Sequence, residues 1–178
     1  MNKRYTLSID RTLKKLNNDQ KLELLSGKNY SKTQNIEELK IDSIRLCEGT
    51  NGLRKPLDDF GVENSEKSTC FPCQSTMAST WNPDLIEEAA EAIAQECKNK
   101  KVNVLFAPNL SIKRNPLAGR NFTFFSEDPY LNSKMGISYV NGLQKNHVGA
   151  CIKDYILSNV ENDRFIANNI IRRCIRNC

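Results

Sequence analysis

Val102-Asn103-Val104-Leu105-Phe106, which Pro108 stops, is a short apolar run of the length expected for a buried strand. A helical pattern precedes it and begins with the cap-then-proline signal Asn82-Pro83. A second helical pattern follows it, from Ser126-Glu127-Asp128-Pro129 toward Lys145. A buried strand between two helices is typical of an α/β chain with parallel strands.

Two further apolar runs lie outside these helices, at 43–47 and 148–152, and each predicts another buried strand. The resulting order of strand, helix, strand, helix, strand is the rhythm of a β/α barrel or of a doubly wound sheet. A complete eightfold barrel takes about 250 residues, and the chain has 178. The patterns therefore predict an α/β fold, either an incomplete barrel or a small open sheet.

Composition indicates an ordinary soluble protein with no strong charge bias. The net charge is +5, and its lysines and arginines are spread along the chain, so we expect no nucleic-acid partner. No apolar run approaches the roughly 20 residues that span a bilayer, so no membrane partner is expected. The basic N-terminus leads into Thr6-Leu7-Ser8-Ile9-Asp10 and not into an apolar segment, which favours a cytoplasmic location.

The seven cysteines predict free thiols and not a disulfide framework, because their number is odd and no secretory signal is recognised. Cys70 and Cys73 form a single C-x-x-C, whereas a structural zinc site usually needs a second pair of ligands. Cys174 and Cys178 have the wrong spacing to supply it, and His147 is the only histidine. We therefore expect no metal and no cofactor.

The loops that follow the predicted strands carry the most specific patterns, and ligands bind at the carboxyl ends of parallel strands in both candidate architectures. In chain order, these stretches are RLCEGTNGLR at 45–54, TCFP at 69–72, ASTWNP at 78–83, APNLSIKRNPLAGRNF at 107–122, FSEDPYL at 125–131 and KDY at 153–155.

In that order and spacing the stretches resemble the N-terminal barrel of glycoside hydrolase family 3. The corresponding family patterns are S-D-G-P-x-G-x-R, T-x-F-P, A-A-T-W-(N/D)-P, G-P-x-x-(N/D)-(I/L)-x-R-x-P-x-x-G-R-x-(F/W)-E-x-(F/Y)-S-E-D-P-(Y/F)-L and K-H-F. The resemblance extends from about Leu16 to Arg164 and is most specific over 114–131. It implies an incomplete (β/α)8 TIM-type barrel, with a helical lead-in at 1–40, β/α units with sugar-site loops at 41–164 and a helical tail at 165–178.

The resemblance implies hydrolysis of terminal β-D-glucosyl residues with retention of configuration, which requires two carboxyl groups about 5–5.5 Å apart. In the family the nucleophile is an aspartate in an S-D-W setting on a later strand, and the acid/base lies in a second domain. Neither setting occurs in these 178 residues. We therefore expect no catalytic residue in this chain, inactivity of the chain alone, and a partner in the remainder of the enzyme.

Two alternatives remain open beside this reading of the chain as the N-terminal part of a β-glucosidase. A degenerate, non-catalytic remnant would bind sugar weakly or not at all. An interaction module would dimerise through an exposed strand edge.

By match of motif, four residues stand at positions where the family contacts its β-glucoside or oligosaccharide substrate: Glu48, Arg120, Lys153 and Asp154. Glu48 replaces an aspartate and is one methylene longer, and Thr50 replaces a proline that stiffens the turn. Asp154 replaces a histidine and places an acid beside Lys153, so that the two would neutralise each other.

Three other residues have both a functional and a structural interpretation. Glu127 and Asp128 are carboxylates of a catalytic type, but at the start of a helix we expect them to act as caps. Trp81 is a candidate sugar-stacking platform. Immediately before a helix cap, however, we expect it to be a core staple.

Overall fold

Three short parallel strands form the centre of the computed structural model, which describes residues 3–57, 64–154, 158 and 161–168, with 3–8 described by their backbone only. The strands are β3 (Leu46–Glu48), β4 (Val104–Phe106) and β5 (Gly149–Ala150), in the order β3-β4-β5. Leu46 pairs with Val104, and Val104 pairs in turn with Gly149. The parallel α/β arrangement predicted from the sequence is confirmed.

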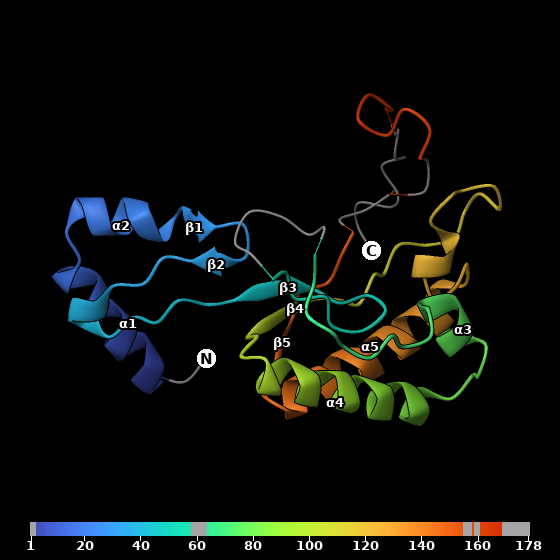
Figure 1. Ribbon diagram of the computed structural model, residues 1–178, viewed down its shortest axis with the longest axis horizontal. Coiled ribbons are helices and arrows are strands. Elements are labelled where there is room, and N and C mark those ends of the chain that lie inside the picture. Colours follow the sequence, from blue (N-terminus) through green and yellow to red (C-terminus); the bar gives the residue numbers. More distant parts are fainter. Residues whose placement is uncertain (1–2, 58–63, 155–157, 159–160, 169–178) are drawn as a thin grey trace.

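Two long helices cover one face of this sheet: α4 (Pro83–Asn99) and α5 (Pro129–Lys145). Figure 1 shows them side by side, with the short helix α3 (Gln74–Ala78) beside the start of α5. Asn82 caps α4 by accepting hydrogen bonds from two backbone amides, so the predicted cap-then-proline start is confirmed. Gly142 lets the helices approach closely, since a Cβ there would lie 2.4 Å from the Glu87 carbonyl oxygen.

The core lies between the sheet and these helices. Tyr139 is fully buried at its centre, where its hydroxyl donates to the Gly49 carbonyl at 3.2 Å and its ring meets Phe125 edge to face. The other large buried side chains of this cluster are Leu53, Ile86, Ile93, Leu105, Met135, Leu143 and Val148.

The lead-in contains strands as well as helices. Helices α1 (Lys3–Lys15) and α2 (Asn18–Leu24) are followed by the antiparallel pair β1 (Gly27–Asn29) and β2 (Lys32–Thr33), and then by the 3-10 turn η1 (Glu37–Leu39). A reciprocal capping box between Asn17 and Gln20 starts α2. Figure 1 shows this lead-in at the opposite end of the molecule from α3.

The observed strands are shorter than the predicted ones at 43–47, 102–106 and 148–152. The first strand starts later because residues 43–46 pair with the lead-in: Thr33 donates to the Ile44 carbonyl at 3.0 Å, and Leu46 donates to the Ser31 carbonyl at 2.8 Å. The Asn103 side chain accepts from the Arg45 amide at 2.9 Å, while the Arg45 carbonyl accepts from the backbone amides of Asn103 and Val104 at 3.0 and 3.1 Å.

The predicted tail helix is not present over residues 165–168, which form a turn and an irregular segment, and 169–178 lie outside the described residues. Within the part of the chain that the structure describes, no helix is long and apolar enough to cross a bilayer.

Candidate sugar-binding site

Glu48 and Lys153 meet at the carboxyl edge of the sheet. Glu48 is the last residue of β3, and Lys153 follows β5. The Lys153 Nζ lies 2.7 Å from the Glu48 Oε2, although β4 separates their strands. The Lys153 side chain is 26% exposed and the Glu48 side chain 42% exposed, so a ligand can reach the pair.

Asn109, in the loop after β4, holds the backbone beside this pair in place through its side-chain hydrogen bonds. It is buried, and its side-chain amide donates to the Asp154 Oδ2 at 3.0 Å. Its side-chain oxygen accepts from the backbone amides of Asp154 and Ser111, each at 3.1 Å. Since Lys153 precedes Asp154, Asn109 fixes the backbone from which the lysine extends.

Gln74 holds Asn109 in turn. Its fully buried side chain accepts from the Asn109 amide at 2.9 Å and donates to the Asn109 carbonyl at 3.2 Å. Gln74 begins α3, so the loop after β4 is anchored to the start of this helix. Neither residue was predicted as part of the site. In the sequence, Asn109 could have been noticed as an amide side chain in the loop after a predicted strand. Gln74 could have been noticed as an amide side chain just after the TCFP stretch.

Asp154 does not neutralise Lys153 by direct pairing. Its carboxylate faces Asn109, and among the described residues the ion pair of Lys153 is with Glu48. The predicted self-neutralising pair is therefore wrong, because the two neighbouring side chains have different partners.

Arg120 is linked to these residues through its backbone, and its side chain has another partner. The guanidinium Nε lies 3.0 Å from the Glu161 carboxylate, and the arginine side chain is 43% exposed. The Arg120 carbonyl accepts from the Thr123 hydroxyl at 2.8 Å, and that hydroxyl accepts from the Asn109 amide at 3.4 Å. The structure thus brings Glu48 and Lys153 together, holds the Asp154 carboxylate on Asn109, and directs the Arg120 side chain to Glu161 instead.

A cavity of about 480 Å³ opens next to Glu48. One wall is the loop 49–54 that follows β3, and the other is formed by Ser65 and residues 68–70. The Ser68 hydroxyl donates to the Leu53 carbonyl at 2.5 Å and joins the two walls. The volume suits a single sugar ring, because small-molecule pockets span about 300–1,000 Å³.

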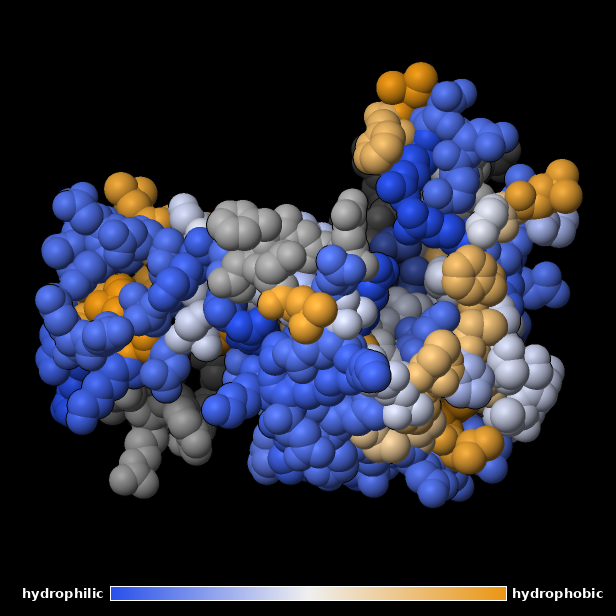
Figure 2. All heavy atoms as spheres, in the orientation of Figure 1, coloured by the Kyte–Doolittle hydropathy of each residue, from blue (hydrophilic) through white to orange (hydrophobic). Residues whose placement is uncertain are grey.

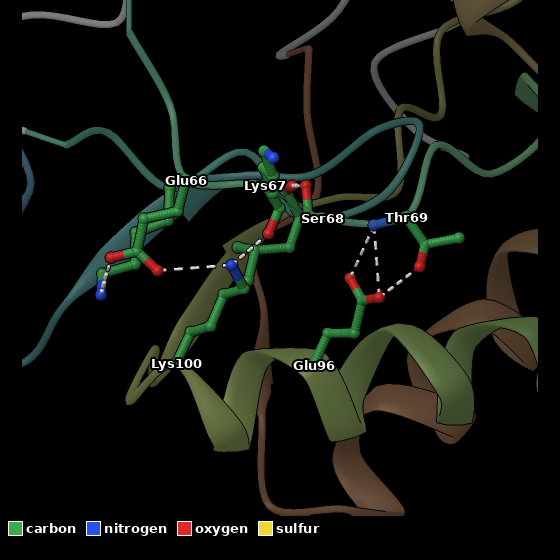
Figure 3. A network of polar contacts seen from close by, with 8 residues as sticks. Glu66, Lys67, Ser68, Thr69, Glu96 and Lys100 are labelled. Atoms are coloured by element: carbon green, nitrogen blue, oxygen red, sulfur yellow. Dashed lines mark hydrogen bonds and ion pairs between the residues drawn. The ribbon is translucent and has the colours of Figure 1, made fainter.

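The second wall is tied to the far end of α4, as Figure 3 shows. The Glu96 carboxylate accepts from the Thr69 amide at 3.2 Å and from its hydroxyl. The Lys100 ammonium donates to the Lys67 carbonyl and, at 3.3 Å, to the Glu66 carboxylate. The hydrogen bond with Lys55 is the main reason that the pKa of Glu66 lies below its ordinary value. Helix α4 thus supports the wall of the cavity.

Two structural interpretations of single residues have different outcomes. Asp128 caps α5 by accepting from the amides of Tyr130 and Leu131 at 3.2 and 3.0 Å, as expected, whereas Glu127 is not the capping residue. The prediction that Trp81 is a core staple is wrong, because its side chain is 73% exposed. Its backbone is left-handed, with a φ of 53°.

The described cysteines are free thiols, as predicted. Burial raises the pKa of Cys73, but hydrogen bonds from Thr76 and Ser75 outweigh it, so the pKa lies below its ordinary value. Over the described ranges, no three potential ligand side chains form a group that could hold a metal ion. Cys174 and Cys178 lie outside those ranges.

The chain resembles known enzymes over most of its length. The model of the glycosyl hydrolase family 3 N-terminal domain matches residues 24–164. Thermostable β-glucosidase B of Acetivibrio thermocellus is 38% identical over 168 residues, which are 93% of this chain and 22% of that protein. Exo-α-(1→6)-L-arabinopyranosidase of Bifidobacterium longum is 40% identical over 157 residues, or 86% of this chain and 21% of that protein.

Solved structures agree with the sequence comparison. The crystal structure of β-glucosidase from Kluyveromyces marxianus in complex with glucose matches with a TM-score of 0.83 and 36% identity, over 88% of this chain and 18% of that one. The chain spans about a fifth of the length of the curated relatives it matches. With the α/β fold of the domain matched at residues 24–164, this chain belongs to glycoside hydrolase family 3.

Proposed function

We propose that this chain supplies part of the glucose-binding site of a retaining β-glucosidase-type glycoside hydrolase. The observation that carries the proposal is the Lys153–Glu48 pair at the carboxyl edge of the sheet, beside a cavity that fits one sugar ring. Its carboxylate accepts and its ammonium donates, so together they can bind two neighbouring hydroxyls of a pyranose. Relatives act on glucosides or arabinopyranosides, which supports a pyranoside ligand.

The architecture that we propose is the first part of a (β/α)8 barrel, formed by residues 41–164 after the lead-in 1–40. The three parallel strands, in sequential order and with α4 and α5 on one face, support it. In such a barrel the ligand lies over the carboxyl ends of the strands, where Glu48 and Lys153 lie. The carboxylates that cleave the glycosidic bond would come from outside these 178 residues, since no S-D-W setting occurs in them.

Binding and hydrolysis test the proposal separately. Calorimetric titration with glucose and with L-arabinopyranose measures binding to the chain. Glu48→Gln and Lys153→Met should each weaken binding by roughly ten-fold or more, because a hydrogen bond to a charged group is worth about 1.5–3 kcal/mol. Glu88→Gln, at an exposed glutamate of α4, is the matched control and should leave affinity unchanged.

Two results would contradict the proposal. If a folded chain bound neither sugar, the alternative of a non-catalytic remnant would be favoured. Release of nitrophenol from an aryl β-glucoside by the chain alone would show that the cleaving carboxylates lie within it.

A further inference from the structure

A second cleft, of about 340 Å³, lies between α3, the turn that precedes α4, the segment 125–127 and the first turn of α5. Within the described part of the chain, it shares no lining residue with the cavity beside Glu48. Six of its residues matter for its chemistry: Ser75, Ser79, Trp81, Lys113, Ser126 and Glu127. Figure 2 shows apolar and weakly polar residues gathered over α3 and its surroundings, next to the hydrophilic surface of α4.

Trp81 presents an exposed aromatic surface at this cleft. It is 73% exposed, and it lines the cleft together with charged and hydroxyl side chains, so its ring is open to a ligand there. The left-handed backbone is unusual for a bulky residue, and the Trp81 amide stabilises it by donating to the Ala78 carbonyl at 3.1 Å. The ring therefore belongs to a defined turn and not to a frayed end.

Lys113 supplies hydrogen-bond donors in the lining of the cleft. Its ammonium donates to the Phe125 carbonyl at 3.3 Å, and this bond uses one of its three N–H groups. Burial lowers the pKa of Lys113, so the ammonium has already lost part of its hydration shell. Glu127 faces the same cleft and attracts the ammonium electrostatically.

We propose that this cleft is a second saccharide-binding site. The C–H face of a pyranose ring lies on the Trp81 indole, and its hydroxyls bind the Lys113 ammonium and the Glu127 carboxylate. An aromatic platform with a few convergent polar groups is the common composition of a small-molecule site. The negative charge of Glu127 disfavours an anionic ligand. Because the positive charge of Lys113 offsets it, the cleft favours a neutral ligand. The inference rests on the proposed function for its choice of a sugar.

The two sites lie on the same side of the domain. In a β/α unit the helix begins where the preceding strand ends, so the starts of α4 and α5 are near the carboxyl edge of the sheet. Figure 1 shows this arrangement, with α3 and the starts of both helices on the side toward which β3 points. A gluco-oligosaccharide is therefore the ligand we assign to the cleft.

Trp81 is the only tryptophan of the chain, so its fluorescence reports this cleft directly. Titration of the chain with cellobiose should shift the emission to the blue and lower its quenching by acrylamide, because the sugar covers the ring. Lys113→Gln and Glu127→Gln should each weaken the apparent affinity about ten-fold. Lys98→Gln and Glu88→Gln, at exposed positions of α4, are the matched controls, and circular dichroism verifies that every variant is folded.

Glu48→Gln separates this inference from the proposed function. A Trp81 response that persists in Glu48→Gln assigns the signal to the second site, whereas its loss there would assign the signal to the first site and overturn the inference. No Trp81 response while calorimetry detects glucose at Glu48 would also overturn it and leave the proposed function standing. Protection of Trp81 that rises with protein concentration without sugar would assign the surface to a second copy of the chain instead.

Discussion

Replacing Asn109 with alanine should uncouple the loop after β4 from the segment after β5. The side chain is 2% exposed, and it bonds to the Asp154 carboxylate at 3.0 Å and to the Asp154 and Ser111 amides at 3.1 Å. A hydrogen bond to a charged group is worth about 1.5–3 kcal/mol and a neutral one about 1 kcal/mol, so the loss is about 4 kcal/mol. For a domain of this size, the melting temperature should fall by roughly 10 °C.

Asn109→Asp keeps the shape and reverses the chemistry, because it replaces the donor with a second carboxylate beside Asp154. Repulsion between the new carboxylate and that of Asp154 raises the pKa of one of the two in the folded variant above the unfolded value of about 3.9. The variant is therefore destabilised above that raised pKa, and stability relative to wild type returns as the pH falls through it. Thermal unfolding between pH 4 and 8 measures this recovery.

The control is Asn115→Ala, which removes an exposed asparagine side chain that accepts a local bond from the Leu117 amide at 3.0 Å. It should cost less than about 1 kcal/mol. Glucose titration of the folded variants should show weaker binding by Asn109→Ala and unchanged binding by Asn115→Ala. The reasoning is refuted if Asn109→Ala and Asn115→Ala have the same melting temperature, or if Asn109→Asp is equally destabilised at pH 4 and pH 8.

Two further predictions concern packing and thiol chemistry. Gly142→Ala should lower the free energy of unfolding by about 1–3 kcal/mol, because the new Cβ meets the backbone of α4. The control is Gly136→Ala in the same helix, whose Cβ meets only the flexible end of a leucine side chain and should change stability little. Chemical denaturation measures both variants. At pH 8, iodoacetamide should alkylate Cys73 at least about 1,000-fold faster than Cys97, because burial raises the pKa of Cys97 to about 12 whereas the pKa of Cys73 lies below its ordinary value. Mass spectrometry measures the two rates, and comparable rates would contradict this difference in pKa.

Local signals in the sequence were sufficient for the long helices. Asn82-Pro83 and Asp128-Pro129 mark the starts of α4 and α5, because a cap acts on amides two or three residues away. Helix α3 was not predicted, since its five residues are too few for a periodic pattern. The Ser75 hydroxyl, which donates to the carbonyls of Asn121 and Phe124, stabilises it through contacts that no local pattern contains.

The site was predicted in part for a similar reason. Glu48 ends one strand of the parallel sheet and Lys153 follows another, so the order of motifs anticipates that they lie at one edge. The ion pair between them and the role of Asn109 depend on side-chain directions in the loop after Pro108, which spacing does not specify. Trp81 was misassigned because a left-handed backbone at one residue directs the ring outward, and apolar periodicity does not register such a turn.

The attachment of residues 66–69 to α4 has a consequence for how the domain opens. Glu96 and Lys100 hold the wall of the Glu48 cavity from the end of a helix that also packs against α5 (Figure 3). The Thr69 amide should therefore exchange its proton with solvent more slowly than it does in Glu96→Ala, which removes its acceptor. A loop transplanted from a relative would need its matching helix end to keep this attachment.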